Sequence, residues 1–324
     1  MNKRKLGKTN LEISEIGFGG WAIGGSWGKQ DESDSVRALH EALDRGVNFI
    51  DTAAGYGDGK SEKIIGRVLR ERREEIIVAT KTPPLPGPWP PTPYCLAEER
   101  YPEKYLRESV EERLRNLGVE AIDVLQLHTW TRAWNRDPYP LHVLAKLKED
   151  GKIRYYGIST PEDDQNSVND LMRRGLIDTV QVIYNIFEQE PAAELLPLAQ
   201  ENGVGIIVRV AFDEGALTGK FTKDKSFDAE DFRNNYFAGD RLERTVARVE
   251  KIAKDVASTG RSMAEVALLF VLAHTAVSTV IPGIRTIEQA RMNTAVSELP
   301  RLSPEVMKLL HGHQWRRAFW YQGK

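Results

Sequence analysis

Four titratable side chains stand at, or just after, the ends of three neighbouring β-branched runs. Asp51 and Tyr56 follow the first of these runs, Lys81 ends the second and His128 ends the third. A phenol is a weak acid at neutral pH, and an adjacent Lys81 ammonium is expected to lower its pKa. Asp51 would hold that ammonium, while His128 would donate a hydrogen bond to a substrate oxygen. The four residue types together suit the addition of hydride to a carbonyl group, with Tyr56 as the proton donor.

Each of these residues also has an ordinary structural interpretation when it is taken alone. Lys81 by itself would equally serve a Schiff-base lyase, with its amine as the nucleophile. A second alternative is a Rossmann domain, because Gly17, Gly19 and Ala22 match the G-x-G-x-x-A pattern after a strand. The glycine-rich residues 23–28 delay the helix that this motif requires, which weakens the Rossmann alternative.

Eight short β-branched runs alternate with helical patterns along the chain. The runs are residues 13–18, 47–50, 76–81, 122–128, 153–159, 180–185, 205–210 and 277–281. This alternation, without a linker rich in proline or serine, predicts an α/β fold of one domain over residues 1–324, a (β/α)8 TIM barrel. Lys3–Leu6 and Leu11–Ile13 predict a short N-terminal β-hairpin that closes the barrel bottom. The carboxyl ends of the strands would bring the four titratable residues to one mouth.

Two long βα loops interrupt the regular alternation, and both follow a strand at the face where barrel enzymes hold their substrates. Thr82–Tyr101 contains seven prolines and is expected to be semi-rigid, while Phe212–Asp240 is long enough to cover a ligand. Trp21 and Trp130 follow the first and fourth predicted strands. We expect these two indoles to wall an apolar or aromatic substrate pocket.

Composition and charge exclude several classes of function. The chain has 324 residues with 45 Lys and Arg against 47 Asp and Glu, so no basic field is expected to attract nucleic acid or a membrane surface. Its longest apolar run is too short for a membrane helix, and no secretory signal is recognised near Met1. The single cysteine, Cys95, suits a cytoplasmic protein. His311 and His313 have no third ligand nearby, so no metal site is expected, and the oligomeric state is left open.

Taken together, the motifs resemble those of the aldo-keto reductase family. They include Phe49–Gly57, Ala79–Lys81, Asp123–His128 and Val280–Gly283, in the order of the family and over nearly the whole chain. The resemblance implies a (β/α)8 barrel that binds NADPH and reduces an aldehyde or ketone to an alcohol. It assigns the proton donor to Tyr56 and the roles of its partners to Asp51, Lys81 and His128. It also leaves open a cofactor-sensing binding subunit on the same barrel, as in channel-associated members of the family.

A set of polar residues and glycines, mostly late in the chain, matches the cofactor site of that family. By resemblance, Ser159 and Gln181 would hold the nicotinamide carboxamide, and the segment around Gly215 would cover the pyrophosphate with its backbone amides. Arg285, close to a helix N-terminus, suits the 2′-phosphate of NADPH. The cofactor residues that the resemblance implies are Ser159, Gln181, Arg209, Gly215, Leu217, Gly283, Arg285, Gln289 and Asn293.

Arg209 stands where many relatives have a tyrosine that stacks on the nicotinamide ring. A guanidinium plane would stack there instead, and its charge would disfavour the cationic oxidised ring relative to NADPH. The alternative is that Arg209 points to a phosphate, or to Asp213 or Glu214.

Overall fold

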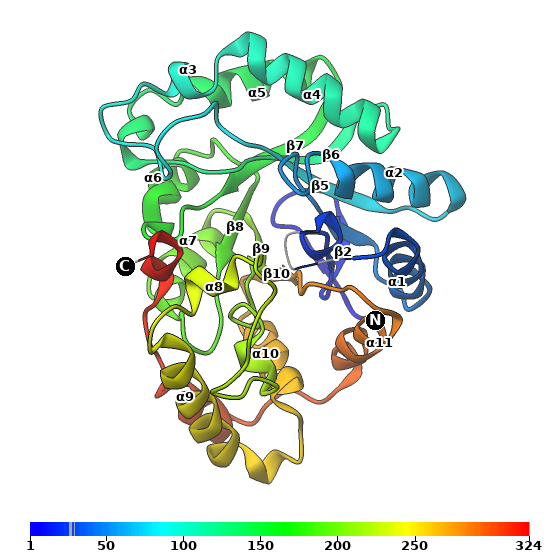
Figure 1. Ribbon diagram of the computed structural model, residues 1–324. Helices are drawn as coiled ribbons and strands as arrows, with labels where there is room; N and C mark the ends of the chain where they lie inside the picture. Colours follow the sequence, from blue (N-terminus) through cyan, green and yellow to red (C-terminus); the bar gives the residue numbers. More distant parts are fainter. Residues whose placement is uncertain (26–27, 29, 324) are drawn as a thin grey trace.

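Eight parallel strands pair in sequence order and curl round, with helices outside them (Figure 1). The computed structural model describes residues 1–25, 28 and 30–323. The first and last strand segments also meet, because the Gly17 amide donates to the Val280 carbonyl at 2.8 Å. The chain therefore forms the (β/α)8 barrel that the sequence predicts. The barrel strands are β3 (Phe18–Gly19), β4 (Phe49–Asp51), β5 (Ile77–Thr82), β6 (Ile122–Leu127), β7 (Ile153–Ser159), β8 (Thr179–Ile183), β9 (Gly205–Arg209) and β10 (Val277–Val280).

The helices form the outer layer, and their apolar faces cover the outward side chains of the strands. In one such contact, Ile64 and Val68 of α2 pack with Leu39 of α1 and with Val78 of β5. None of the helices in the described part of the chain is long and apolar enough to cross a membrane. The helices are α1 (Glu32–Asp44), α2 (Lys60–Glu71), α3 (Ala97–Arg100), α4 (Glu103–Leu117), α5 (Tyr139–Glu149), α6 (Asn169–Arg173), α7 (Leu195–Glu201), α8 (Arg233–Tyr236), α9 (Arg241–Asp255), α10 (Met263–Leu272), α11 (Ile287–Ala295) and α12 (Pro304–His311).

The N-terminal hairpin is present and closes the bottom of the barrel. Strand β1 (Lys3–Lys5) pairs antiparallel with β2 (Glu12–Ser14). Side chains of the hairpin, Leu6, Leu11 and Ile13, pack into one cluster with Phe49 and Ile77 of the barrel strands. This apolar contact removes the lower end of the barrel from water.

The prediction of a first barrel strand over residues 13–18 is wrong at its start. Ile13 belongs to the hairpin, and the barrel strand β3 begins only at Phe18. The reason is a buried turn between them: the Glu15 carboxylate accepts hydrogen bonds from Asn2 and Arg4 and so fixes the chain where it changes direction. β-branched residues on both sides of this turn made the two strands look like one.

Side chains inside the barrel change from apolar to polar along the strands. In β5, Ile77 and Ala79 belong to the apolar cluster at the bottom, while Lys81, two residues further, ends at the mouth. Because successive side chains of a strand point to opposite faces, every second residue enters the barrel. Asp51 on β4 and Gln181 on β8 reach the mouth in the same way. The mouth is therefore polar above an apolar core.

The proline-rich loop after β5 is held from below by side-chain donors. Arg100 donates from Nε to the Leu85 carbonyl at 2.8 Å and from Nη1 to the Pro88 carbonyl at 3.0 Å. Trp134 donates from its indole to the Cys95 carbonyl at 2.7 Å. These bonds tie the loop to α3 and to the segment after β6. Its semi-rigid character stays a prediction.

A buried charged network joins β5 to the helices outside it. The Glu62 carboxylate, completely buried on α2, accepts from Thr80 at 2.6 Å, from Arg113 at 2.7 Å and from Asn116 at 2.9 Å. Thr80 directly precedes Lys81, so this network holds the strand that carries the site lysine.

We predict that Glu62→Ala lowers the free energy of unfolding by about 3–5 kcal/mol, because the buried Arg113 cation loses its buried partner and keeps only the more exposed Glu112. Urea or thermal unfolding followed by circular dichroism measures this loss. The control is Glu108→Ala, which breaks an exposed pair with Lys104 and should change stability by less than about 0.5 kcal/mol. Equal effects of the two substitutions would contradict the assignment of Glu62 as a structural anchor.

Candidate active site

The loop after β4 places Tyr56 through a close backbone contact. Gly57 has φ of +66°, and a Cβ atom there would lie 2.2 Å from the Gly24 carbonyl oxygen. Only glycine fits this position, because a side chain would meet both the steric limit and the left-handed backbone. The contact holds the Tyr56 loop against the turn η1 (Ala22–Gly24), next to Trp21.

A buried ion pair lies at the centre of the mouth. The Lys81 ammonium is 2.6 Å from Asp51 Oδ1, 2.9 Å from the Thr52 carbonyl oxygen and 3.1 Å from the Tyr56 hydroxyl. The other Asp51 oxygen accepts the Gln181 amide at 2.7 Å. Lys81 and Asp51 are both almost completely buried. The structure thus brings three of the four predicted catalytic residues into direct contact.

His128, the fourth predicted residue, lies beside Tyr56. The two ring centroids are 5.9 Å apart at an angle of 71°. The His128 ring also meets Trp89 edge-on at 5.8 Å. An imidazole and a phenol therefore face the same part of the cavity, as the predicted site requires.

The electrostatics keep these groups in defined protonation states. Burial works against the Lys81 ammonium, but the Asp51 carboxylate and the Tyr56 hydroxyl together outweigh it, so the pKa of Lys81 is raised. Burial also raises the pKa of Tyr56, and the Lys81 cation offsets only part of that rise. Burial, with the Lys81 and Arg209 cations, holds the pKa of His128 well below its usual value. At neutral pH the site therefore holds a cationic lysine, a protonated phenol and a neutral imidazole.

This result corrects one expectation from the sequence. Lys81 lowers the pKa of the Tyr56 phenol, as we expected, but burial raises that pKa by more, so the net shift is upward. The physical reason is that burial in the barrel mouth removes water from the phenolate, and Asp51, which lies beyond Lys81, adds a like charge. The Tyr56 phenol is consequently protonated at neutral pH.

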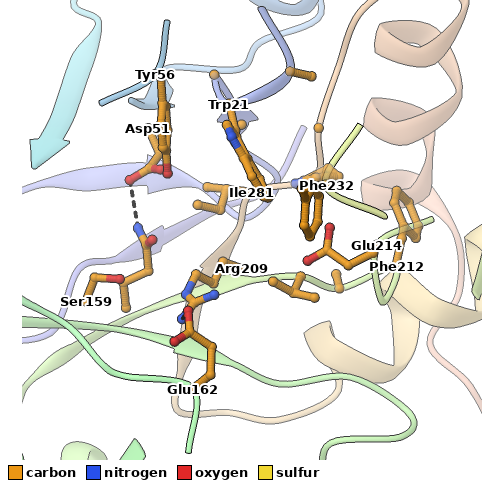
Figure 2. A pocket seen from close by; sticks show the side chains of 18 of the residues that line it. Trp21, Asp51, Tyr56, Ser159, Glu162, Arg209, Phe212, Glu214, Phe232 and Ile281 are labelled. Carbon is orange, nitrogen blue, oxygen red and sulfur yellow. Dashed lines mark hydrogen bonds and ion pairs between the residues drawn. The ribbon is translucent and has the colours of Figure 1, made fainter. Parts of the chain in front are cut away.

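A cavity of about 440 Å³ opens above these residues. Figure 2 shows Tyr56 and Asp51 on one side of it and Arg209 and Glu214 on the other. The cavity lies next to a second cavity of about 210 Å³, because Phe212, Gly215 and Gly283 line both. Together they form a trough that leads from the catalytic residues across the barrel mouth.

The trough collects most of the predicted cofactor residues. Ser159, Gln181, Arg209 and Gly215 line the first cavity. Residues at and before helix α11 line the second: Gly283, Arg285, Gln289 and Asn293. Leu217 is the exception, because its side chain is completely buried in the core and lines neither cavity.

The backbone amides around Gly215 are already engaged. The Gly215 and Leu217 amides both donate to the Phe212 carbonyl, at 3.0 and 2.9 Å. Backbone donors of this segment are therefore not directed at the trough in this structure, which differs from what the resemblance implies. The tight turns of the segment use these donors internally.

The Arg209 guanidinium forms a hydrogen bond with neither Asp213 nor Glu214, the two acids proposed from the sequence as its partners. Its Nη2 donates to the Glu162 carboxylate and to the Thr160 carbonyl, each at 3.1 Å, rather than to Asp213 or Glu214. Its Nε is buried and, within the described residues, has no hydrogen-bond partner. An unsatisfied buried donor on a cavity wall is an expected feature of a site that binds an acceptor.

Aromatic side chains form the upper wall of the first cavity, but not the pair that we predicted. Trp21 lines it and packs against Phe232, with the ring centroids 4.9 Å apart and the planes tilted by 35°. Trp130 is completely buried, donates its indole N–H to Asn135 and packs edge-on against Trp134 at 5.2 Å, so its assignment to the pocket is wrong. The loop after β5 brings Trp89 to the wall instead.

The C-terminal turn supplies a residue that sequence reasoning missed. Tyr321, on the turn η8 (Ala318–Gln322), lines the first cavity and donates its hydroxyl to Glu214. The turn is held by Arg317, which is almost completely buried, stacks on Phe187 at 4.3 Å and pairs with Asp213. In Figure 1 this turn lies beside α8.

Three other residues of the site were also missed. Gln126, which donates to Asp51 at 3.3 Å, precedes His128 by two positions, so the period of a strand could have identified it. Glu162 and Glu214 lie in loops, where no periodicity indicates which side chains face a cavity.

Among the residues that the structure describes, no group of three or more His, Cys, Asp and Glu side chains is placed to hold a metal ion. His313 lies 2.8 Å from Asp255.

Comparisons with known proteins agree on one family. Residues 15–314 match the model of the Aldo/keto reductase family. The chain is 34% identical to the Uncharacterized oxidoreductase YqkF of Bacillus subtilis (strain 168), over 97% of this chain and 96% of that protein. It is 30% identical to the NADH-specific methylglyoxal reductase of Escherichia coli (strain K12), over 91% and 93%. The solved structure of the glycerol dehydrogenase AKR11B4 from Gluconobacter oxydans is 30% identical, with a TM-score of 0.78 and coverage of 96% and 94%.

We predict that His128 stays neutral from pH 6 to pH 8, because its pKa is lowered by burial and by two cations. Its ring-proton resonances, assigned by their loss in His128→Asn, should keep a constant chemical shift over this range. A titration midpoint between pH 6 and 8 would show that the imidazole becomes charged there, and would contradict the prediction.

Proposed function

The chain belongs to the aldo/keto reductase family of carbonyl-reducing oxidoreductases, and on this premise we propose that it reduces an aldehyde or ketone with NADPH, Tyr56 being the proton donor. The observation that carries the proposal is the contact of 3.1 Å between the Tyr56 hydroxyl and the Lys81 ammonium, which is itself held by Asp51 at 2.6 Å. A buried phenol beside a clamped cation can release its proton to a stronger base.

The residues of the trough fit a nicotinamide dinucleotide. The unpartnered Arg209 Nε at the catalytic end offers a donor to an amide or phosphate oxygen. Ser159 and Gln181 add uncharged polar groups of the kind that a carboxamide needs. At the other end Arg285 and Lys220 offer cations to phosphates. The role of Arg209 against the nicotinamide ring stays a prediction.

The reaction follows from the protonation states of this site. When bound, the cofactor supplies a hydride to the carbonyl carbon. The neutral His128 imidazole can donate one hydrogen bond to the carbonyl oxygen, where negative charge develops. Tyr56 then gives its proton to that oxygen, which as an alkoxide is a far stronger base than a phenolate. Lys81 stabilises the phenolate that remains, and Asp51 keeps Lys81 charged and in place.

The upper wall of the cavity supports an apolar or aromatic group on the carbonyl substrate. Trp21, Trp89 and Phe232 present rings to the cavity. Trp89 is 47% exposed. Rings that are already held in place bind apolar surface with little loss of side-chain freedom.

Two alternatives make different use of the same residues. A Schiff-base role for Lys81 needs a neutral amine, but its nitrogen already contacts three oxygens and the Asp51 carboxylate keeps it charged. A cofactor-sensing subunit would need the dinucleotide site but not the proton donor, so the ordered contact between Tyr56 and Lys81 favours catalysis.

We also propose that the protein acts in the cytoplasm on a small molecule. Its one cysteine, Cys95, suits a reducing compartment. Its net charge of −2 gives no general attraction for nucleic acid.

Tyr56→Phe should lower the rate of carbonyl reduction by about 10²- to 10⁴-fold, because it removes the proton donor while leaving the ring in place. The decrease of NADPH absorbance with a panel of aliphatic, aromatic and sugar aldehydes measures the rate. The matched control is Tyr155→Phe, which removes a hydroxyl bonded to Asn10 at the opposite end of the barrel and should leave the rate unchanged. Equal rates in wild type and Tyr56→Phe would remove Tyr56 from the mechanism.

Arg285→Ala should weaken NADPH binding by about 10- to 100-fold, the loss expected for charge-assisted hydrogen bonds to a phosphate. NADH, which lacks the 2′-phosphate, should lose less than about threefold. Dissociation constants from quenching of tryptophan fluorescence measure both effects. Arg291→Ala is the control, because Arg291 lies on α11, shortly after Arg285 in the chain, but pairs with Glu41 at the surface. A similar loss for both cofactors would contradict a preference for NADPH that rests on Arg285.

A further inference from the structure

Glu214 is a buried carboxyl on the cavity wall that the proposed proton transfer does not use. It is 3% exposed, and its Oε1 accepts the Tyr321 hydroxyl. Figure 2 shows its carboxyl group between Phe212 and Phe232, across the cavity from Tyr56. A buried acid with so few partners is costly to keep unless it has a task.

The backbone holds Glu214 in this place against a conformational preference. Val210, Asp213 and Glu214 have φ of +58°, +48° and +54°, although none of them is a glycine. Such a backbone conformation is strained for a residue with a side chain and persists only where the surroundings enforce it. Here Asp213 is fixed by the Tyr236 hydroxyl at 3.0 Å and by the buried Arg317. The neighbouring fold therefore determines the direction of the Glu214 side chain.

Glu214 lies where the two cavities of the trough meet, which we call the joint. It lines the first cavity, and the next residue, Gly215, lines both cavities. A dinucleotide that reaches from Tyr56 to Arg285 must pass this joint, and its central part is an anionic pyrophosphate. An ionised carboxylate at this point would repel that group in a poorly hydrated environment.

Four titratable or charged groups from the surrounding elements act on Glu214. They are Tyr321 on the C-terminal turn, Asp213 on the same loop, Arg209 at the end of β9 and Arg233 on α8. Both cations are shared with other acids, because Arg209 bonds Glu162 at 3.1 Å and Arg233 bonds Asp231 at 2.6 Å. Burial is the largest influence and raises the pKa of Glu214 to about 7, against the lowering effect of the Tyr321 hydrogen bond.

On the premise of the proposed function, we infer that Glu214 is a proton-coupled cofactor-binding residue, which takes up one proton from solvent when a dinucleotide fills the trough. The carboxylate becomes a neutral carboxyl group, so the repulsion of the pyrophosphate is removed and an O–H donor is gained at the joint. No other bond forms or breaks. Cofactor affinity is thereby linked to pH through a residue outside the catalytic set.

The sign of the linkage follows from the free protein. Well below pH 7 Glu214 is already protonated, so the affinity is nearly constant. Above pH 7 a proton must be added on binding, and the dissociation constant rises by up to about tenfold per pH unit. Proton uptake approaches one per cofactor near pH 8.

Two measurements on the full-length protein test the inference. Dissociation constants for NADPH and NADH are determined from pH 6 to pH 9 by quenching of tryptophan fluorescence. Calorimetry at pH 8 in two buffers of different ionisation enthalpy counts the protons taken up. NADH is included because it lacks the 2′-phosphate, whose own ionisation near pH 6 would otherwise contribute.

Two variants should change the profile in different ways. Glu214→Gln is neutral at every pH, so it should bind with a nearly constant dissociation constant and take up no proton at this residue. Tyr321→Phe removes the hydrogen bond that lowers the pKa of Glu214, so the loss of affinity should begin at a higher pH. Glu243→Gln, an exposed change on α9, should keep the wild-type profile.

The possible results separate this inference from the proposed function. Wild-type affinity that falls above pH 7 with proton uptake, both abolished in Glu214→Gln, supports it. Dinucleotide binding that is independent of pH, or a slope that survives in Glu214→Gln, overturns it while leaving the proposed function intact. Failure of wild type to bind either dinucleotide at any pH overturns both.

Discussion

The buried ion pair between Lys81 and Asp51 is the constraint on which the rest of the mouth depends. Burying two charges is unfavourable unless their remaining hydrogen-bonding capacity is satisfied. Here the Thr52 carbonyl and the Tyr56 hydroxyl complete the shell of the ammonium, and Gln181 bonds the carboxylate. The position of the Tyr56 hydroxyl is thus set by the same interactions that make the buried charges tolerable. A proton donor placed in this way needs no further ordering when substrate arrives.

The barrel separates stability from chemistry along the direction of its strands. The lower half is closed by apolar side chains of the hairpin and the strands, such as Leu6 against Phe49. Lys81 continues β5 directly above Ala79 of that core. A rigid apolar base therefore carries the polar residues, and substitutions in loops at the mouth need not disturb it.

The far wall of the cavity depends on contacts between segments distant in sequence. The loop that carries Glu214 has strained backbone, and the C-terminal turn holds it through Arg317 and Tyr321. Strain that is maintained by tertiary contacts keeps a buried carboxyl beside the path of an anionic ligand. The same turn that closes the cavity thus also determines the electrostatic environment of the carboxyl group.

The sequence by itself determined the barrel and the four catalytic candidates. Strand periodicity and the convergence of parallel strands are local and topological rules, and they place Asp51, Lys81 and His128 at neighbouring strand ends. The same rules could have identified Gln126, which shares the inward face of β6 with His128. Only the tertiary structure decided that Trp89 rather than Trp130 lines the cavity, that Arg209 bonds Glu162, and that Tyr321 meets Glu214. It also decided the upward shift of the Tyr56 pKa. Loop side chains follow no period, and desolvation is a sum over all surrounding atoms, so neither can be read from the order of residues along the chain.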